Sequence, residues 1–179
     1  MFCSFGAAFG LATFSYFPQH VCKKMDKTVR KTFGKECQYF SIETPDSLKL
    51  NHEVYKVIDG DTVEGYAIVT RALGCQLGGC DKPKKDTIAF EQFFFMTAFD
   101  HQKRIKKVRI LEYTSNHGYE VANKGWLKQF VSEEEFEVGK NIDGISGATI
   151  SVKSITKNVN LQRQIIRQLD TEPTSIVAE

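Results

Sequence analysis

The sequence predicts an α+β fold, in which one domain combines a mostly antiparallel sheet with a helix at each end. Two stretches, residues 21–33 and 152–169, have the apolar periodicity of amphipathic helices, and strand-like runs fill most of the chain between them. The chain has 179 residues, of which 41% are hydrophobic and 26% are charged. This composition is typical of a globular domain with a sizeable core, and no repeat or linker divides residues 21–170.

The first predicted helix carries Val21, Met25, Val29 and Phe33 on one side, because these apolar residues recur at four-residue spacing. Gly34 follows them directly, and glycine commonly ends a helix. We therefore expect the helix to end at this glycine.

The middle of the chain is divided into short apolar runs that are separated by turn residues. Asp100 to Lys103 separates the last two runs and predicts that they form a hairpin. The predicted strands are Cys37–Ile42, Val54–Ile58, Gly65–Arg71, Ile88–Phe99 and Ile105–Tyr113.

Two helical segments are predicted after the strands. Trp126, Leu127 and Phe130 have the spacing of a short helical face. A longer apolar stripe runs from Val152 to Leu169. Residues 171–179 contain a proline and are predicted to be a loose tail.

The N-terminal residues 1–20 are predicted to be an export signal or a membrane anchor. Met1 to Phe17 carries no charge and is rich in Phe, Ala and Gly. Lysines and arginines follow this run instead of preceding it, which is the reverse of the usual export polarity. The alternative is an ordinary buried segment. An export signal predicts an extracytoplasmic protein, periplasmic or at the cell surface.

The cysteines are consistent with that location. Five are present, and removal of Cys3 with a leader leaves an even number, as expected for a disulfide-bonded exported chain. Cys75 and Cys80 flank two glycines that let the chain fold back, which predicts a disulfide. The alternatives are two independent thiols or a redox-active pair. No metal or haem site is predicted, since the chain contains no CxxC motif and its histidines are scattered.

The charge pattern argues against a nucleic-acid partner. The net charge is only +2, and the densest basic stretch, Lys103 to Arg109, alternates with apolar residues. This alternation favours a solvated face of a half-exposed strand over a nucleic-acid footprint.

A candidate anion site directly precedes the C-terminal helix. The first backbone N–H groups of a helix lack internal partners and favour a phosphate. Gly144 and Gly147 permit tight turns there, and Ser146, Thr149 and Ser151 supply hydroxyls. The alternative is an ordinary helix cap.

The segment Asp143-x-x-Ser146-Gly147-Ala148-Thr149 resembles the attachment motif of the FMN-binding domain family. That family includes the extracytoplasmic flavin subunits of ion-pumping NADH:quinone and ferredoxin:NAD oxidoreductases, and small exported relatives. The resemblance implies that the side-chain oxygen of Thr149 is joined to the FMN phosphate as a phosphoester by a separate flavin transferase.

Further segments extend the resemblance over roughly residues 25 to 170 and follow the family's order: Gly65–Ala67, His117–Glu120 and Trp126–Phe130. The family loop before the tryptophan usually reads Glu-Thr-Pro-Gly-Leu-Gly, whereas Tyr113 to Tyr119 stands there in this chain. Residues 74–83 have no counterpart in the large oxidoreductase subunits, which favours a small exported relative.

The resemblance also implies roles around the flavin. Gly118 lies in the loop that is expected near the flavin, and Trp126 is expected either to stack on the flavin ring or to anchor its helix from the core. Asp143 is assigned to recognition by the flavin transferase, with a simple turn residue as the alternative.

The implied function is a covalently flavinylated electron carrier that relays electrons between a membrane donor and an extracytoplasmic acceptor. We expect a redox carrier or an oxidoreductase subunit rather than a stand-alone enzyme, because the sequence shows no acid/base set for substrate activation. Two alternatives remain: a fixed flavin subunit of a membrane oxidoreductase, and a flavin-free binding module.

Overall fold

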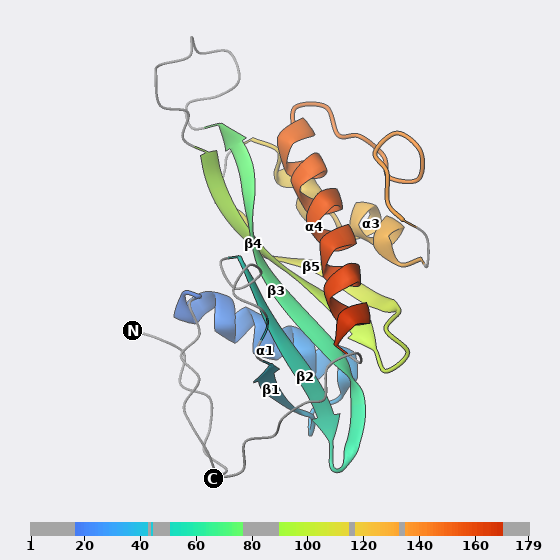
Figure 1. Ribbon diagram of the computed structural model, residues 1–179. Coiled ribbons are helices and arrows are strands. Elements are labelled where there is room, and N and C mark those ends of the chain that lie inside the picture. Colours follow the sequence, from blue (N-terminus) through green and yellow to red (C-terminus); the bar gives the residue numbers. More distant parts are fainter. Residues whose placement is uncertain are drawn as a thin grey trace.

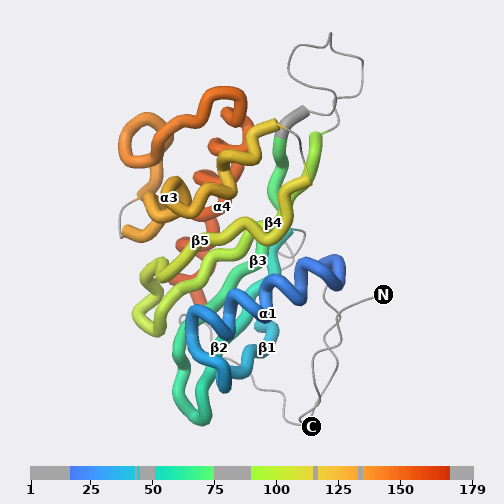
Figure 2. The backbone as a smooth tube through the Cα atoms, turned by 180° about the vertical axis from the view of Figure 1, so that it is seen from behind, coloured from blue at the N-terminus to red at the C-terminus, as the bar shows by residue number. Residues whose placement is uncertain are grey.

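The computed structural model describes residues 17–42, 44, 51–76, 90–114, 117–132 and 135–169. They form one α+β domain whose five-stranded antiparallel sheet has the simple order β1-β2-β3-β4-β5. Helix α4 covers one face of the sheet and α1 lies on the other (Figures 1 and 2). The elements are α1 Gln19–Phe33, β1 Gln38–Ile42, β2 His52–Asp59, β3 Thr62–Gln76, β4 Phe90–Asp100, β5 Ile105–Glu112, η1 Tyr119–Ala122, α3 Lys124–Leu127, η2 Lys128–Phe130 and α4 Thr149–Gln168.

Helix α1 follows the predicted periodicity. Val21, Met25 and Val29 are buried, and Phe33 packs at the edge of the same cluster. The helix ends at Gly34, which has a φ of 136° and donates its N–H to Arg30 O at 3.1 Å. The predicted helix and its glycine stop are therefore confirmed.

The predicted strands are present, but β2 and β3 are longer than the sequence indicated. The hairpin between β4 and β5 turns over residues 101–104, as expected. Gly65 of β3 pairs with Asp100 at the end of the neighbouring strand β4. A Cβ atom at this position would lie 2.0 Å from the carbonyl oxygen of Phe99, so only glycine fits there without a backbone shift.

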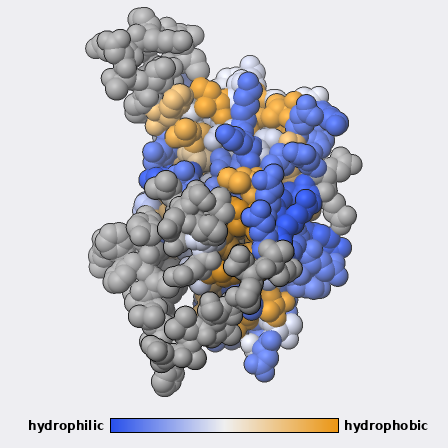
Figure 3. Space-filling model, viewed as in Figure 1, coloured by the Kyte–Doolittle hydropathy of each residue, from blue (hydrophilic) through white to orange (hydrophobic). Residues whose placement is uncertain are grey.

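The sheet separates two apolar clusters because alternate residues of each strand point to opposite faces. Ile68 and Ala72 of β3 face the cluster that contains α4, α3 and η2. Ala67 and Val69 face the cluster beneath α1. Hydrophilic side chains cover much of the surface over α4 (Figure 3).

The structure describes only part of the predicted leader. Residues 1–16 and the tail 171–179 lie outside the described residues. Phe17 is buried and packs edge-to-face on Phe94, with 5.5 Å between ring centroids, so core packing extends to this residue. Among the described residues, no helix combines the length and the apolar character needed to cross a membrane.

The predicted pairing of Cys75 and Cys80 also falls outside the described side chains. Cys22 is disulfide-bonded, whereas Cys37 is a free, buried thiol. Burial raises the pKa of the Cys37 thiol, which donates to Gly34 O at 2.9 Å.

Candidate functional site

Helix α4 begins at Thr149, the residue that the sequence singles out. Ala148 occupies the N-cap position with a φ of −121° and a ψ of 19°, and no side chain caps the helix. The backbone N–H groups of Thr149, Ile150 and Ser151 have no acceptor among the described residues. An ordinary hydroxyl cap therefore does not account for this segment, and unpaired donors are available to an anion.

The turn into α4 depends on one of the two predicted glycines. Gly147 adopts a φ of 77°, in the left-handed region that favours glycine. Ala148 N–H then donates to Ile145 O at 3.1 Å, which closes the turn. Gly144 has no positive φ and is not assigned to a turn, so of the two glycines that permit tight turns only Gly147 uses this freedom.

Trp126 holds the start of the segment through its indole N–H, which donates to the carbonyl oxygen of Asp143 at 2.9 Å. The Trp126 ring is buried and lies edge-to-face against Phe130, with 5.3 Å between centroids. Of the two roles expected for Trp126, the contacts support the buried anchor.

Gln129 binds Asp143 at two points. Its amide nitrogen donates to Asp143 Oδ2 at 2.9 Å, and its amide oxygen accepts the Asp143 backbone N–H at 2.8 Å. Asp143 is thus held by three hydrogen bonds from α3 and η2. The carboxylate has a structural partner, so Asp143 is more than a simple turn residue.

The other end of the segment is held by Tyr113 and Gly118. The Tyr113 hydroxyl donates to His117 O at 2.7 Å and lies 2.9 Å from Ser151 Oγ. Since the tyrosine proton is used on His117 O, Ser151 is the donor in the second bond. Gly118 has a φ of 75°, and a Cβ there would lie 3.0 Å from the Ala148 Cβ.

The three hydroxyl residues of this segment differ in solvent exposure. Ser151 is completely buried, as is the neighbouring Ala148, whereas Thr149 and Ser146 are exposed. The hydroxyl of Thr149 is therefore accessible at the start of a helix whose preceding loop is fixed at both ends. A second protein can reach it.

Residues 91–162 match the family model described as the FMN-binding domain. This region of the chain is similar to an FMN-binding domain. The matched range is shorter than the resemblance drawn from the sequence, but it contains the attachment segment and all of its anchors. A search of curated proteins found no match.

The residues of the matched region fit a flavin phosphate near Thr149. The match supports FMN as the cofactor, and the unpaired N–H groups of α4, the Gly147 turn and the exposed hydroxyl suit its phosphate group. The described part of the chain brings together no three His, Cys, Asp or Glu side chains that could hold a metal ion.

Sequence reasoning identified Asp143, Ser146, Gly147, Ala148, Thr149, Ser151, Gly118 and Trp126, and the structure brings all of them to one end of α4. It missed the roles of Gln129 and Tyr113. Gln129 follows Trp126 by three residues and therefore points to the same side of the helical segment. This spacing could have predicted that Gln129 lies near Trp126.

Proposed function

We propose that this protein is an extracytoplasmic electron carrier whose FMN is joined covalently to Thr149. The supporting observation is that Thr149 is the exposed first residue of α4, directly after the Gly147 turn and beside unpaired backbone N–H groups. In this step the Thr149 oxygen forms a new P–O bond to the flavin phosphate of a flavin dinucleotide, the P–O bond to the nucleotide half breaks, the nucleoside monophosphate leaves, and the threonine proton is released. A separate flavin transferase would catalyse the transfer.

The protein contributes attachment and positioning in this proposal. FMN supplies the capacity to accept and donate one or two electrons. Gln129 and Trp126 fix the backbone at Asp143, while Tyr113 and Gly118 fix the other end of the segment. The exposed Thr149 leaves the flavin accessible to a membrane donor and to an extracytoplasmic acceptor.

The location outside the cytoplasm is supported by the uncharged run Met1 to Phe17. Fractionation of native cells is expected to find the protein on the membrane or outside the cytoplasm. A soluble cytosolic pool would contradict this part of the proposal without affecting the attachment site.

The attachment is tested by comparing Thr149→Ala with Ser146→Ala after co-expression with a flavin transferase. Both changes remove an exposed hydroxyl from the same loop. Thr149→Ala is expected to be folded and free of covalent flavin, whereas Ser146→Ala keeps the flavin. Thr149→Ser retains the reacting hydroxyl and is expected to keep partial labelling.

Covalent flavin is measured by in-gel fluorescence after denaturation, and folding by circular dichroism. Because Thr149 is exposed and caps nothing, Thr149→Ala should change the free energy of unfolding by no more than about 0.5 kcal/mol. Flavin that stays attached to folded Thr149→Ala would overturn the assignment.

A further inference from the structure

A pocket of about 420 Å³ lies between α1, β5 and α3, and shares no lining residue with the segment 143–149. Its walls come from parts of the chain that are far apart in sequence. Six cationic residues line it: Lys31, Lys106, Lys107, Arg109, Lys124 and Lys128.

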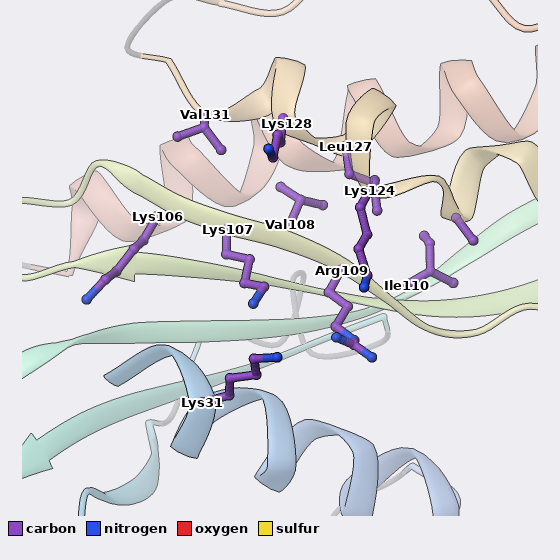
Figure 4. A pocket seen from close by; sticks show the side chains of 11 residues that line it. Lys31, Lys106, Lys107, Val108, Arg109, Ile110, Lys124, Leu127, Lys128 and Val131 are labelled. Atoms are coloured by element: carbon purple, nitrogen blue, oxygen red, sulfur yellow. The ribbon is translucent and has the colours of Figure 1, made fainter. Parts of the chain in front are cut away.

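Four of these residues form what we call the basic cluster: Lys31, Lys107, Arg109 and Lys124. Their nitrogen atoms point into the space between α1, β5 and α3 (Figure 4). Lys106 differs, because its ammonium lies over the ring of Phe33, 5.1 Å from the centroid.

Among the described residues, no carboxylate compensates the positive charge of the basic cluster, since none lines the pocket. Within the described part of the chain, none of the four side chains forms an ion pair or hydrogen bond. Burial, and then the charges of Arg109, Lys31 and Lys124, lower the pKa of Lys107. The free protein therefore holds like charges together, and a bound anion would relieve their repulsion.

The remaining lining is apolar and includes Val108, Leu127 and Val131. A small concave site with apolar walls and converging cations suits a compact ligand that has a multiply charged end and an organic remainder. An extended acidic protein segment requires a longer stripe of positive charge, whereas these cations converge from three elements on one space. The pocket therefore favours a small phosphate compound.

We propose that this pocket binds a phosphate-bearing small anion, with its phosphate group on the basic cluster and its organic part against Val108, Leu127 and Val131. The site is separate from the attachment segment. α3 and η2 connect the two, since Trp126 and Gln129 hold Asp143 while Lys124 and Lys128 line the pocket. The proposal does not require flavin at Thr149.

The test is calorimetric titration of the full chain with pyrophosphate at constant ionic strength. The variant Lys107→Gln/Arg109→Gln is expected to weaken binding about tenfold or more, since two of the four converging charges are removed. The control Lys24→Gln/Lys157→Gln removes the same charge from exposed helix positions outside the pocket and should bind like the wild type. Lys31→Gln/Lys124→Gln, at two exposed positions, provides a second test if the first variant fails to fold.

Thr149→Ala should bind pyrophosphate with the affinity of the wild type. The pocket proposal can therefore be tested whether or not flavin is attached at Thr149. Competition by vesicles containing phosphatidic acid, but not by phosphatidylcholine vesicles, would identify a lipid headgroup as the source of the phosphate. The proposal is wrong if the wild type shows no saturable binding, or if both pocket variants bind normally. It is also wrong if a hexaglutamate peptide binds through the basic cluster and pyrophosphate does not displace it.

Discussion

Thr149 is the first residue of α4 and Ala148 precedes it as the uncapped N-cap residue. At the residue scale, the Thr149 hydroxyl does not act as a helix cap. A capping hydroxyl is occupied by backbone N–H groups, whereas the Thr149 hydroxyl is exposed and has no such bond. The cost of about 1 kcal/mol that is typical of losing a cap therefore does not apply to Thr149→Ala.

The two glycines before Thr149 give a matched pair of substitutions. Gly147 has a φ of 77°, so Gly147→Ala should lower the free energy of unfolding by about 1–2 kcal/mol through backbone strain. Gly144 lacks a positive φ, and a Cβ atom added there would meet only open space. Gly144→Ala should therefore change stability by less than about 0.5 kcal/mol. Urea unfolding measures both, and equal effects would contradict the role assigned to Gly147.

The site could be predicted only in part from the sequence. Thr149 and its neighbours form a contiguous motif, so they were found together. Gln129 contacts Asp143 across 14 residues, and Tyr113 contacts Ser151 across 38. Such contacts depend on how α3 and β5 dock against α4, and no local pattern encodes that docking.

At the scale of elements, apolar periodicity predicted both long helices, and the turn residues Asp100 to Lys103 predicted the β4–β5 hairpin. The ends of β2 and β3 were not predicted, because they depend on pairing with a neighbouring strand. His52, the first residue of β2, pairs with Thr70 of β3. His52 is part of the sheet because of this long-range pairing. The residues around it are not apolar, so the sequence pattern did not predict a strand there.

His52, Thr70 and Gln162 join β2, β3 and α4 in the interior. Gln162 Nε2 donates to Thr70 Oγ1 at 2.6 Å, and the same oxygen lies within hydrogen-bond distance of His52 Nδ1, at 2.7 Å. Burial of the His52 ring lowers its pKa and so favours the neutral form. This network links the sheet to the helix that carries Thr149.

Stability is predicted to fall as the pH falls, because burial lowers the pKa of His52 below its ordinary value. The unfolded chain then binds the proton more readily, so the contribution is present above the ordinary histidine pKa of about 6.5 and is lost below it. His52→Gln should reduce this pH dependence in urea unfolding, whereas His101→Gln, at an exposed turn position, should leave it unchanged. Identical pH profiles for the wild type and both variants would contradict the network.

At the scale of the whole molecule, the proposed attachment segment and the pocket lie at different places in the domain. Residues 143–149 lead into α4, whereas the pocket lies between β5, α1 and α3. The sequence predicted a solvated strand face for Lys103 to Arg109, and β5 is indeed half-exposed. However, Lys107 and Arg109 line the pocket with Lys31 and Lys124, an arrangement that only the assembled fold reveals.

The central claim is the covalent bond between Thr149 and FMN, and the most direct measurement is peptide mass spectrometry of protein purified from its native host. Trypsin cleaves after Lys140 and Lys153, which places Thr149 in the peptide Asn141–Lys153. We expect this peptide to be heavier by the mass of FMN less one water, and fragmentation to assign the addition to Thr149. An unmodified peptide at full occupancy, or a flavin on another residue, would contradict the account.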